Sequence, residues 1–206
     1  MRFLTADFLY PLHRSPVKEG VLQISDKGEV IAILENRTDI PKKKLEVFEG
    51  ILCAGFVNAH CHLELSHLLG IAKKGRGFLE FVGAIKKRDA FSKSEIQEAI
   101  ERAEMQMINN GIVAVGDICN TTDTLLQKQK ANLYYYNFIE TFQVHENKIE
   151  QTIKDALQIR NKFRQAKMKA TIVPHSPFSV PPNLAKEIVN TFDEEDELLT
   201  VHLQET

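Results

Sequence analysis

The stretch ILCAGFVNAHCH, residues 51–62, decides the fold of this 206-residue chain, because an apolar run ends there in a His-x-His pair. Successive side chains of a β-strand point to opposite faces, so we expect His60 and His62 on one side and Cys61 on the other. Two neutral imidazoles on one side can bind the same ion. The pair alone is a weak indication, since two histidines this close also arise by chance or pack as hydrogen-bonded polar groups.

A second stretch, VHLQET at residues 201–206, makes a metal site the better interpretation. It places His202 at the end of another apolar segment and Glu205 three residues later. Catalytic zinc sites usually take three protein ligands and keep one position for water. His60, His62 and His202 could supply the three ligands, and Glu205 is placed to move protons without binding the ion.

The segments between these motifs predict an α/β fold. From residue 55 onwards, strands are expected at 55–60, 112–118, 133–142, 170–173 and 198–203, and helices at about 78–88, 94–109, 147–165 and 182–192. Ser92 and Glu95 form a capping box for the second of these helices, which Asn110-Gly111 ends. Strands that alternate with helices imply a parallel sheet. Before residue 55, short strands with turns are expected at 2–10, 20–24 and 29–34.

These motifs resemble the amidohydrolase superfamily, in its branch of cytosine deaminases, chlorohydrolases and adenosylhomocysteine deaminases. The segments GFVNAHCHLE (55–64), VPHSPF (173–178) and VHLQE (201–205) are similar to that branch's first, fourth and fifth barrel strands. The segment LELSHL (63–68) is most similar to the aminodeoxyfutalosine deaminases. The resemblance covers essentially the whole chain and implies a metal-dependent (β/α)8 TIM barrel that follows part of a small β-sandwich.

The length of the chain implies that the barrel is incomplete. A closed barrel of this type takes roughly 250 residues, whereas about 150 follow the first unit. We therefore expect part of a β-sandwich over residues 1–54 and about five strands of the barrel over residues 55–206. In the family, later strands carry a further histidine and an aspartate ligand. The chain is thus expected to be truncated, and its 206 residues alone to be inactive.

The resemblance also implies roles for the candidate residues. His60, His62 and His202 would bind one divalent ion, zinc or alternatively iron, and Glu205 would be the catalytic proton carrier. His175 stands where relatives with two metals place a carboxylated lysine. Imidazole cannot form that bridge, which favours a single ion and a substrate contact for His175. A structural histidine is the alternative.

Glu64 follows the His-x-His pair and is the other candidate for substrate binding, because its carboxylate could bind a ribose or an amine. The alternative for Glu64 is an ordinary surface acid.

The predicted function is a metal-dependent hydrolase that deaminates an aminated heterocycle, such as an adenine-bearing nucleoside derivative, through a metal-bound hydroxide. A chlorohydrolase or cyclic amidase of the same superfamily is the alternative among enzymes. A non-catalytic truncated remnant is the alternative from another class.

Composition excludes several other classes. The formal net charge of −2 gives no basis for binding nucleic acid, and the apolar run at 51–59 is too short to span a bilayer. The first residues meet an acid, Asp7, before a signal peptide could form. We expect a cytoplasmic protein that takes a small-molecule substrate. The sequence leaves its oligomeric state open, a homo-oligomer included.

Overall fold

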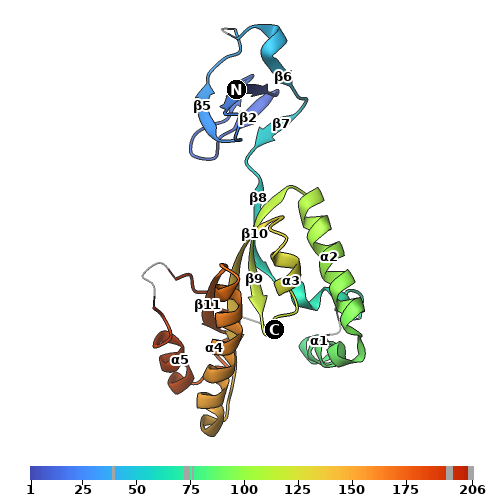
Figure 1. Cartoon of the computed structure of the whole chain (residues 1–206), viewed down its shortest axis with the longest axis vertical. Coiled ribbons are helices and arrows are strands. Elements are labelled where there is room, and N and C mark those ends of the chain that lie inside the picture. The colour runs from blue at the N-terminus through green and yellow to red at the C-terminus, as the bar shows by residue number, and fades with distance from the viewer. Residues whose placement is uncertain (39, 72–74, 76, 194–196, 204–206) are drawn as a thin grey trace. The chain divides into compact units, whose positions relative to one another are not determined.

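The computed structural model describes residues 1–38, 40–71, 75, 77–193 and 197–203, and divides into two compact units, Met1–Gly55 and Phe56–Thr206 (Figure 1). The sequence had placed the division at residue 54. Among the described residues, no helix is long and apolar enough to cross a membrane.

The first unit consists of two small sheets. One sheet has the order β5-β4-β1-β6, and the other has the order β3-β2-β7. The strands are β1 (Arg2–Thr5), β2 (Phe8–Tyr10), β3 (Val17–Lys18), β4 (Val21–Ile24), β5 (Val30–Leu34), β6 (Leu45–Val47) and β7 (Ile51–Cys53), with a 3-10 turn η1 at Lys42–Lys44. Membership of this unit in a larger β-sandwich stays a prediction.

The single strand expected over residues 2–10 is two strands, β1 and β2, that belong to different sheets. Asp7 lies between them. Its carboxylate accepts a hydrogen bond from the Gly50 amide at 2.8 Å, and its backbone carbonyl accepts one from the Glu19 amide at 3.0 Å. These bonds fix a bend that strand periodicity cannot reveal, because they join residues far apart in the sequence.

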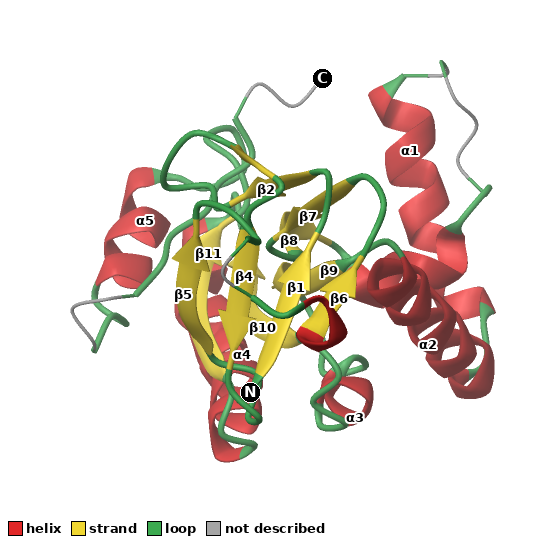
Figure 2. Cartoon of the chain, turned by 90° about the horizontal axis from the view of Figure 1, so that it is seen from above, coloured by secondary structure: helices red, strands yellow, loops and turns green. Residues whose placement is uncertain are grey.

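The second unit is built on a four-stranded parallel sheet with the order β11-β10-β9-β8. The strands are β8 (Phe56–Cys61), β9 (Ile112–Cys119), β10 (Tyr134–Thr141) and β11 (Lys169–Pro174). The helices are α1 (Phe78–Ile85), α2 (Lys93–Asn109), α3 (Leu125–Lys128), α4 (Ile149–Gln165) and α5 (Pro182–Val189), with 3-10 segments η2 (Leu63–Leu68), η3 (Lys86–Ala90) and η4 (Glu146–Lys148). Among the described residues, the helices α1 to α5 all fall within this unit, and Figure 2 colours them red and the strands yellow. The predicted alternation and parallel sheet are confirmed, while the one-turn helix α3 had not been expected.

The two faces of this sheet have different surroundings. On one face, Ile139 and Ile172 pack against Phe163 of α4 and Leu184 of α5, and Val115 packs against Ile100 of α2. On the other face, a smaller buried cluster contains Ile118, Phe138 and Val173. At the carboxyl ends of the strands, His60, Glu140 and His175 lie on this second face.

The fifth strand expected at 198–203 is not a strand in the structure. The backbone N–H of His202 donates to the carbonyl of His175 at 2.7 Å. However, the N–H of Leu198 donates to the hydroxyl of Tyr136 at 2.9 Å. In a ladder this N–H would donate to a backbone carbonyl of the neighbouring strand instead. One backbone bond does not make a ladder. The segment nevertheless places His202 beside the end of β11.

Candidate metal centre

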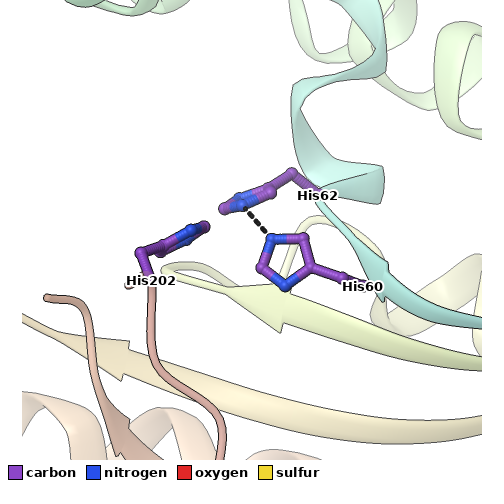
Figure 3. Close-up of side chains that lie close together, drawn as sticks. All are labelled: His60, His62 and His202. Carbon is purple, nitrogen blue, oxygen red and sulfur yellow. Dashed lines mark hydrogen bonds between the residues drawn. The ribbon is translucent and has the colours of Figure 1, made fainter. Parts of the chain in front are cut away.

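Three imidazoles meet at the carboxyl end of the parallel sheet (Figure 3). His60 lies near the end of β8, His62 is the residue before η2, and His202 comes from the segment beside β11. The ring centroids are 5.1 Å apart for His60 and His62, 4.7 Å for His60 and His202, and 5.4 Å for His62 and His202. The structure thus brings together the three residues that the sequence proposed as metal ligands.

The nitrogens of these rings face one another. One ring nitrogen from each of the three histidines lies within 4.8 Å of the other two. The Nε2 atoms of His60 and His62 are only 3.2 Å apart. Either one nitrogen donates a hydrogen bond to the other, or both direct their lone pairs at a third group. A cation bound by lone pairs is such a group. The donor set therefore fits a divalent metal that prefers imidazole nitrogen.

The surroundings keep two of these imidazoles neutral. Burial first, and then the neighbouring rings of His60 and His202, together lower the pKa of His62 to about 4. The pKa of His60 is also lowered, first by burial and then by His202. A neutral imidazole is the form that binds a metal. Near pH 7 both residues therefore carry the lone pairs that an ion needs.

The backbone after His62 is fixed by a buried carboxylate. The N–H of Leu63 donates to Oδ1 of Asp117 at 2.8 Å, and Oδ2 of Asp117 is paired with the ammonium of Lys128. Lys128 also donates to Oδ1 of Asn137 at 2.7 Å. Sequence reasoning had assigned Asp117 no role. The available signal was a charged residue inside the apolar strand IVAVGDIC, which needs a buried partner.

His175 joins the three histidines as a fourth ring. Its centroid lies 5.0 Å from that of His202, and its Nδ1 lies 2.8 Å from the hydroxyl oxygens of both Ser176 and Ser179. The ring of Phe142 is an edge-on neighbour at 5.8 Å. This surrounding fixes the orientation of His175 at the edge of the cluster, while its contact with a substrate stays a prediction.

Glu140 is a member of the cluster that sequence reasoning missed. Its Oε1 lies 3.3 Å from Nε2 of His202, and its side chain is only 5% exposed. Glu140, His175 and His202 form a second group whose candidate ligand atoms lie within 4.8 Å of one another. Residues 136, 138 and 140 share one face of β10. The sequence signal was therefore a glutamate that continues the face on which the aromatic residues Tyr136 and Phe138 lie.

Glu64 lies in a different set of contacts. Its side chain is 1% exposed, and its carboxylate accepts hydrogen bonds from the backbone N–H and the hydroxyl of Thr121 at 3.0 and 2.7 Å. The guanidinium of Arg88 donates to it at 3.1 Å. Glu64 thereby ties η2 to η3 and to the loop after β9, and its role in substrate binding stays a prediction. Glu205, the predicted proton carrier, lies outside the described residues.

Comparison with known proteins defines the family of this chain. The sequence profile of the Amidohydrolase family matches residues 51–206, which contain all four clustered histidines. The chain belongs to the amidohydrolase family. An adenosine deaminase of Helicobacter pylori is 25% identical over 172 residues, which are 81% of this chain and 41% of that protein.

Solved structures show the same fold. A Helicobacter pylori aminofutalosine deaminase in complex with methylthio-coformycin superposes with a TM-score of 0.76 at 20% identity, covering 98% of this chain and 50% of the other. The zinc complex of the atrazine chlorohydrolase TrzN from Arthrobacter aurescens gives 0.72 at 13% identity, with 98% and 52% covered. The predicted fold class, an incomplete TIM barrel of this family, is confirmed. The chain spans about half the length of these proteins or less.

Proposed function

We propose that the protein is a metal-dependent hydrolase that removes the exocyclic amine of an adenine-bearing nucleoside derivative. One divalent ion, with zinc as the first candidate, is bound by His60, His62 and His202. The observation that supports this most directly is the convergence of three ring nitrogens within 4.8 Å at the carboxyl end of a parallel sheet. Enzymes with β/α barrels build their active sites at this end.

Each residue has a separate task in this proposal. A bound zinc ion lowers the pKa of a coordinated water to about 7, which makes a nucleophile available at neutral pH. His175 orients the heterocycle, because its ring is held beside His202 by Ser176 and Ser179. Glu205 takes a proton from the attacking water and gives it to the ring nitrogen. It then moves a second proton, from the hydroxyl group added to the ring, to the leaving amine, and general acid–base catalysis of this kind is worth roughly 100- to 10,000-fold in rate.

The proposed substrate class is supported by the relatives. One similar protein is named an adenosine deaminase, and a structural neighbour was solved with methylthio-coformycin. The structural likeness to TrzN, an atrazine chlorohydrolase, supports a hydrolytic dechlorinase as the second candidate. Both candidates use the same metal ligands and differ in the leaving group.

Metal binding is tested first by substitution. His60→Ala, His62→Ala and His202→Ala should each lower the zinc content after dialysis against dilute zinc, because each removes one ligand. His145→Ala removes an exposed histidine outside the cluster and should leave the zinc content unchanged. Wild-type zinc content in all three ligand variants would overturn the proposed site.

The reaction is tested by its products. Because the 206 residues alone are expected to be inactive, turnover is tested on a full-length version that carries the later barrel strands of the family. This version should release ammonia from adenine-bearing nucleosides, whereas chloride release from a chlorinated heterocycle would favour the second candidate. Glu205→Gln should keep the metal and abolish turnover, because it removes a proton carrier and leaves the ligands in place. Loss of metal from this variant would contradict the assigned role.

A further inference from the structure

The segment 197–203, here called the His202 segment, is held at both of its ends. At one end, the backbone N–H of His202 donates to the carbonyl of His175 at 2.7 Å. At the other end, Nη2 of Arg164 in α4 donates to Oε1 of Glu197. The Glu197 side chain is only 3% exposed, so water screens this ion pair little.

Arg164 is itself fixed by two further contacts. Its Nε donates to the carbonyl of Ala170 in β11 at 3.1 Å. Its Nη1 donates to both carboxylate oxygens of Asp193 at 2.8 and 2.7 Å. A guanidinium is a planar, rigid donor, so its contacts fix one another. One side chain therefore joins β11, the chain after α5 and the start of the His202 segment.

Tyr136 provides a second contact at the same end of the segment. Its hydroxyl oxygen accepts from the N–H of Leu198 at 2.9 Å and lies 2.6 Å from the hydroxyl oxygen of Thr171. Tyr136 is paired in register with Lys169, the first residue of β11. The residues Glu197 and Leu198 are thus both fixed beside the start of β11, by Arg164 and by Tyr136.

The register of the His202 segment against β11 is not set by a ladder. In the described part of the chain, the bond from His202 to His175 is the one backbone hydrogen bond that this segment makes. Ala170 and His175 are five positions apart, as are Glu197 and His202, so the segment runs beside β11 with little spare length. Side chains of an extended chain alternate between two sides, and a shift by one residue would turn the His202 ring away from the other imidazoles.

We propose that Arg164 and Tyr136 are positioning residues for the metal centre, which set the register of the His202 segment and so direct its imidazole to the ion. Neither residue touches the ion. The inference rests on the proposed function, because it assumes that His202 is a metal ligand. The contacts of Glu197 and Leu198 with these two residues are called the anchor.

Amide hydrogen exchange, followed by NMR on the zinc-free protein, tests the anchor without metal. In Arg164→Gln, the amides of Leu198 and His202 should exchange roughly 10-fold faster or more. The amide of Ile139 in β10 should keep its wild-type rate, which shows that the sheet is intact. Arg102→Gln makes the same chemical change at an exposed arginine of α2 and should alter none of these rates.

Two conservative variants separate the contributions of the anchor. Tyr136→Phe keeps the ring and removes the acceptor of the Leu198 N–H, so that amide should exchange faster. Tyr134→Phe is the matched control on the same strand, because the Tyr134 side chain is 60% exposed. Arg164→Lys keeps the charge without the planar fork and should recover only part of the protection lost in Arg164→Gln.

Inserted glycines test the register, with zinc affinity measured by competition with a chromophoric chelator. A glycine between Leu199 and Thr200 lengthens the chain between the anchor and His202, whereas a glycine between Asp193 and Glu194 leaves that length unchanged. The first variant should bind zinc as weakly as His202→Ala does. The second variant should bind zinc as the wild type does.

The outcomes separate this inference from the proposed function. Wild-type zinc affinity in the first insertion variant, or an equal loss in both, overturns the inference. Wild-type exchange of the Leu198 amide in Tyr136→Phe overturns it as well, even if Arg164→Gln fails to fold. If His202→Ala keeps full zinc affinity, the proposed metal site fails, whereas the exchange rates still decide whether the anchor holds the segment.

Discussion

Lys128 and Asp117 form an ion pair in which neither side chain is exposed to solvent. Lys128 lies on α3 and Asp117 on β9, and the same ammonium donates to Asn137 of β10. Burial lowers the pKa of Lys128, but Cys119 and Asp117 raise it more strongly, so the net shift is upward and the group stays charged. The pair joins a loop helix to two strands and, through Leu63, to the backbone after His62.

Replacing one member of this pair should be costly. Lys128→Met leaves the Asp117 carboxylate buried without its cation, and we expect a loss of about 3–5 kcal/mol in the free energy of unfolding. Lys130→Met removes an exposed lysine that pairs with Glu101, so it should cost less than about 1 kcal/mol. Urea unfolding followed by circular dichroism measures both. Equal midpoints for the two variants would contradict the assigned role of the buried pair.

Gly116 should tolerate no side chain, because β8 passes very close to it. A Cβ at this position would lie 2.6 Å from the carbonyl oxygen of Ala59 and 3.0 Å from Cε2 of Phe138. Gly116→Ala must push back the backbone next to His60, at a cost of about 1–3 kcal/mol, and should also weaken zinc binding.

Gly83→Ala is the matched control for this change. Gly83 lies in α1, and a Cβ there meets nothing within 4 Å. Because alanine favours the helix, the variant should be about 0.5–1 kcal/mol more stable than the wild type. The two substitutions should thus shift the melting temperature in opposite directions. A shift of the same sign would show that the close approach of the Ala59 carbonyl does not determine the effect of Gly116→Ala.

The capping box of α2 should contribute measurably to stability. The hydroxyl of Ser92 accepts from the N–H of Glu95 at 3.3 Å, and the carboxylate of Glu95 accepts from the N–H of Ser92 at 2.8 Å. Ser92→Ala should lower the free energy of unfolding by about 1 kcal/mol, while Ser92→Asn should restore most of it. Chemical denaturation of the three proteins tests this, and an unrescued loss in Ser92→Asn would argue against capping as the cause.

The metal-free protein should lose stability on acidification, partly because of His62. Its folded-state pKa is about 4, below the ordinary value of ~6.5. Above pH ~6.5 His62 is neutral in both states and contributes no pH dependence. As the pH falls from about 6.5 to about 4, the unfolded chain takes up a proton that the folded chain does not, so stability declines over this window.

His62→Asn should flatten this decline, because it removes the titrating group. The measurement is the free energy of unfolding in the presence of a chelator at several pH values between about 7.5 and 4. Parallel curves for the wild type and the variant would show that His62 does not contribute.

The sequence was sufficient to predict whatever depends on local periodicity. Alternation of side chains along residues 55–62 predicted that His60 and His62 would face the same point, and the structure confirms their approach at 3.2 Å. Long apolar segments likewise predicted β9, β10 and β11. Each of these predictions concerns a segment whose own pattern fixes its conformation.

Features that depend on distant partners could not be predicted in this way. Glu140 meets His202 across 62 positions, and the alternation along β10 indicates the face on which Glu140 lies but not its partner. The segment at 198–203 has the composition of a strand, but Tyr136 takes one of the hydrogen bonds that a ladder would need. The bend at Asp7 depends on Gly50, which is 43 positions away.

The order of strands in the second unit has a consequence for how the chain folds during synthesis. In the first unit, β1 pairs with β6 and β2 with β7, so its sheets cannot form until nearly the whole unit has been made. In the second unit, each strand from β8 to β11 lies beside its predecessor, so the sheet can grow one strand at a time as the chain leaves the ribosome. His60 and His62 are positioned at the start of this growth, and the segment that carries His202 is made only after the four strands β8 to β11. Acquisition of a metal ion would therefore report the docking of the His202 segment rather than the formation of the four-stranded sheet.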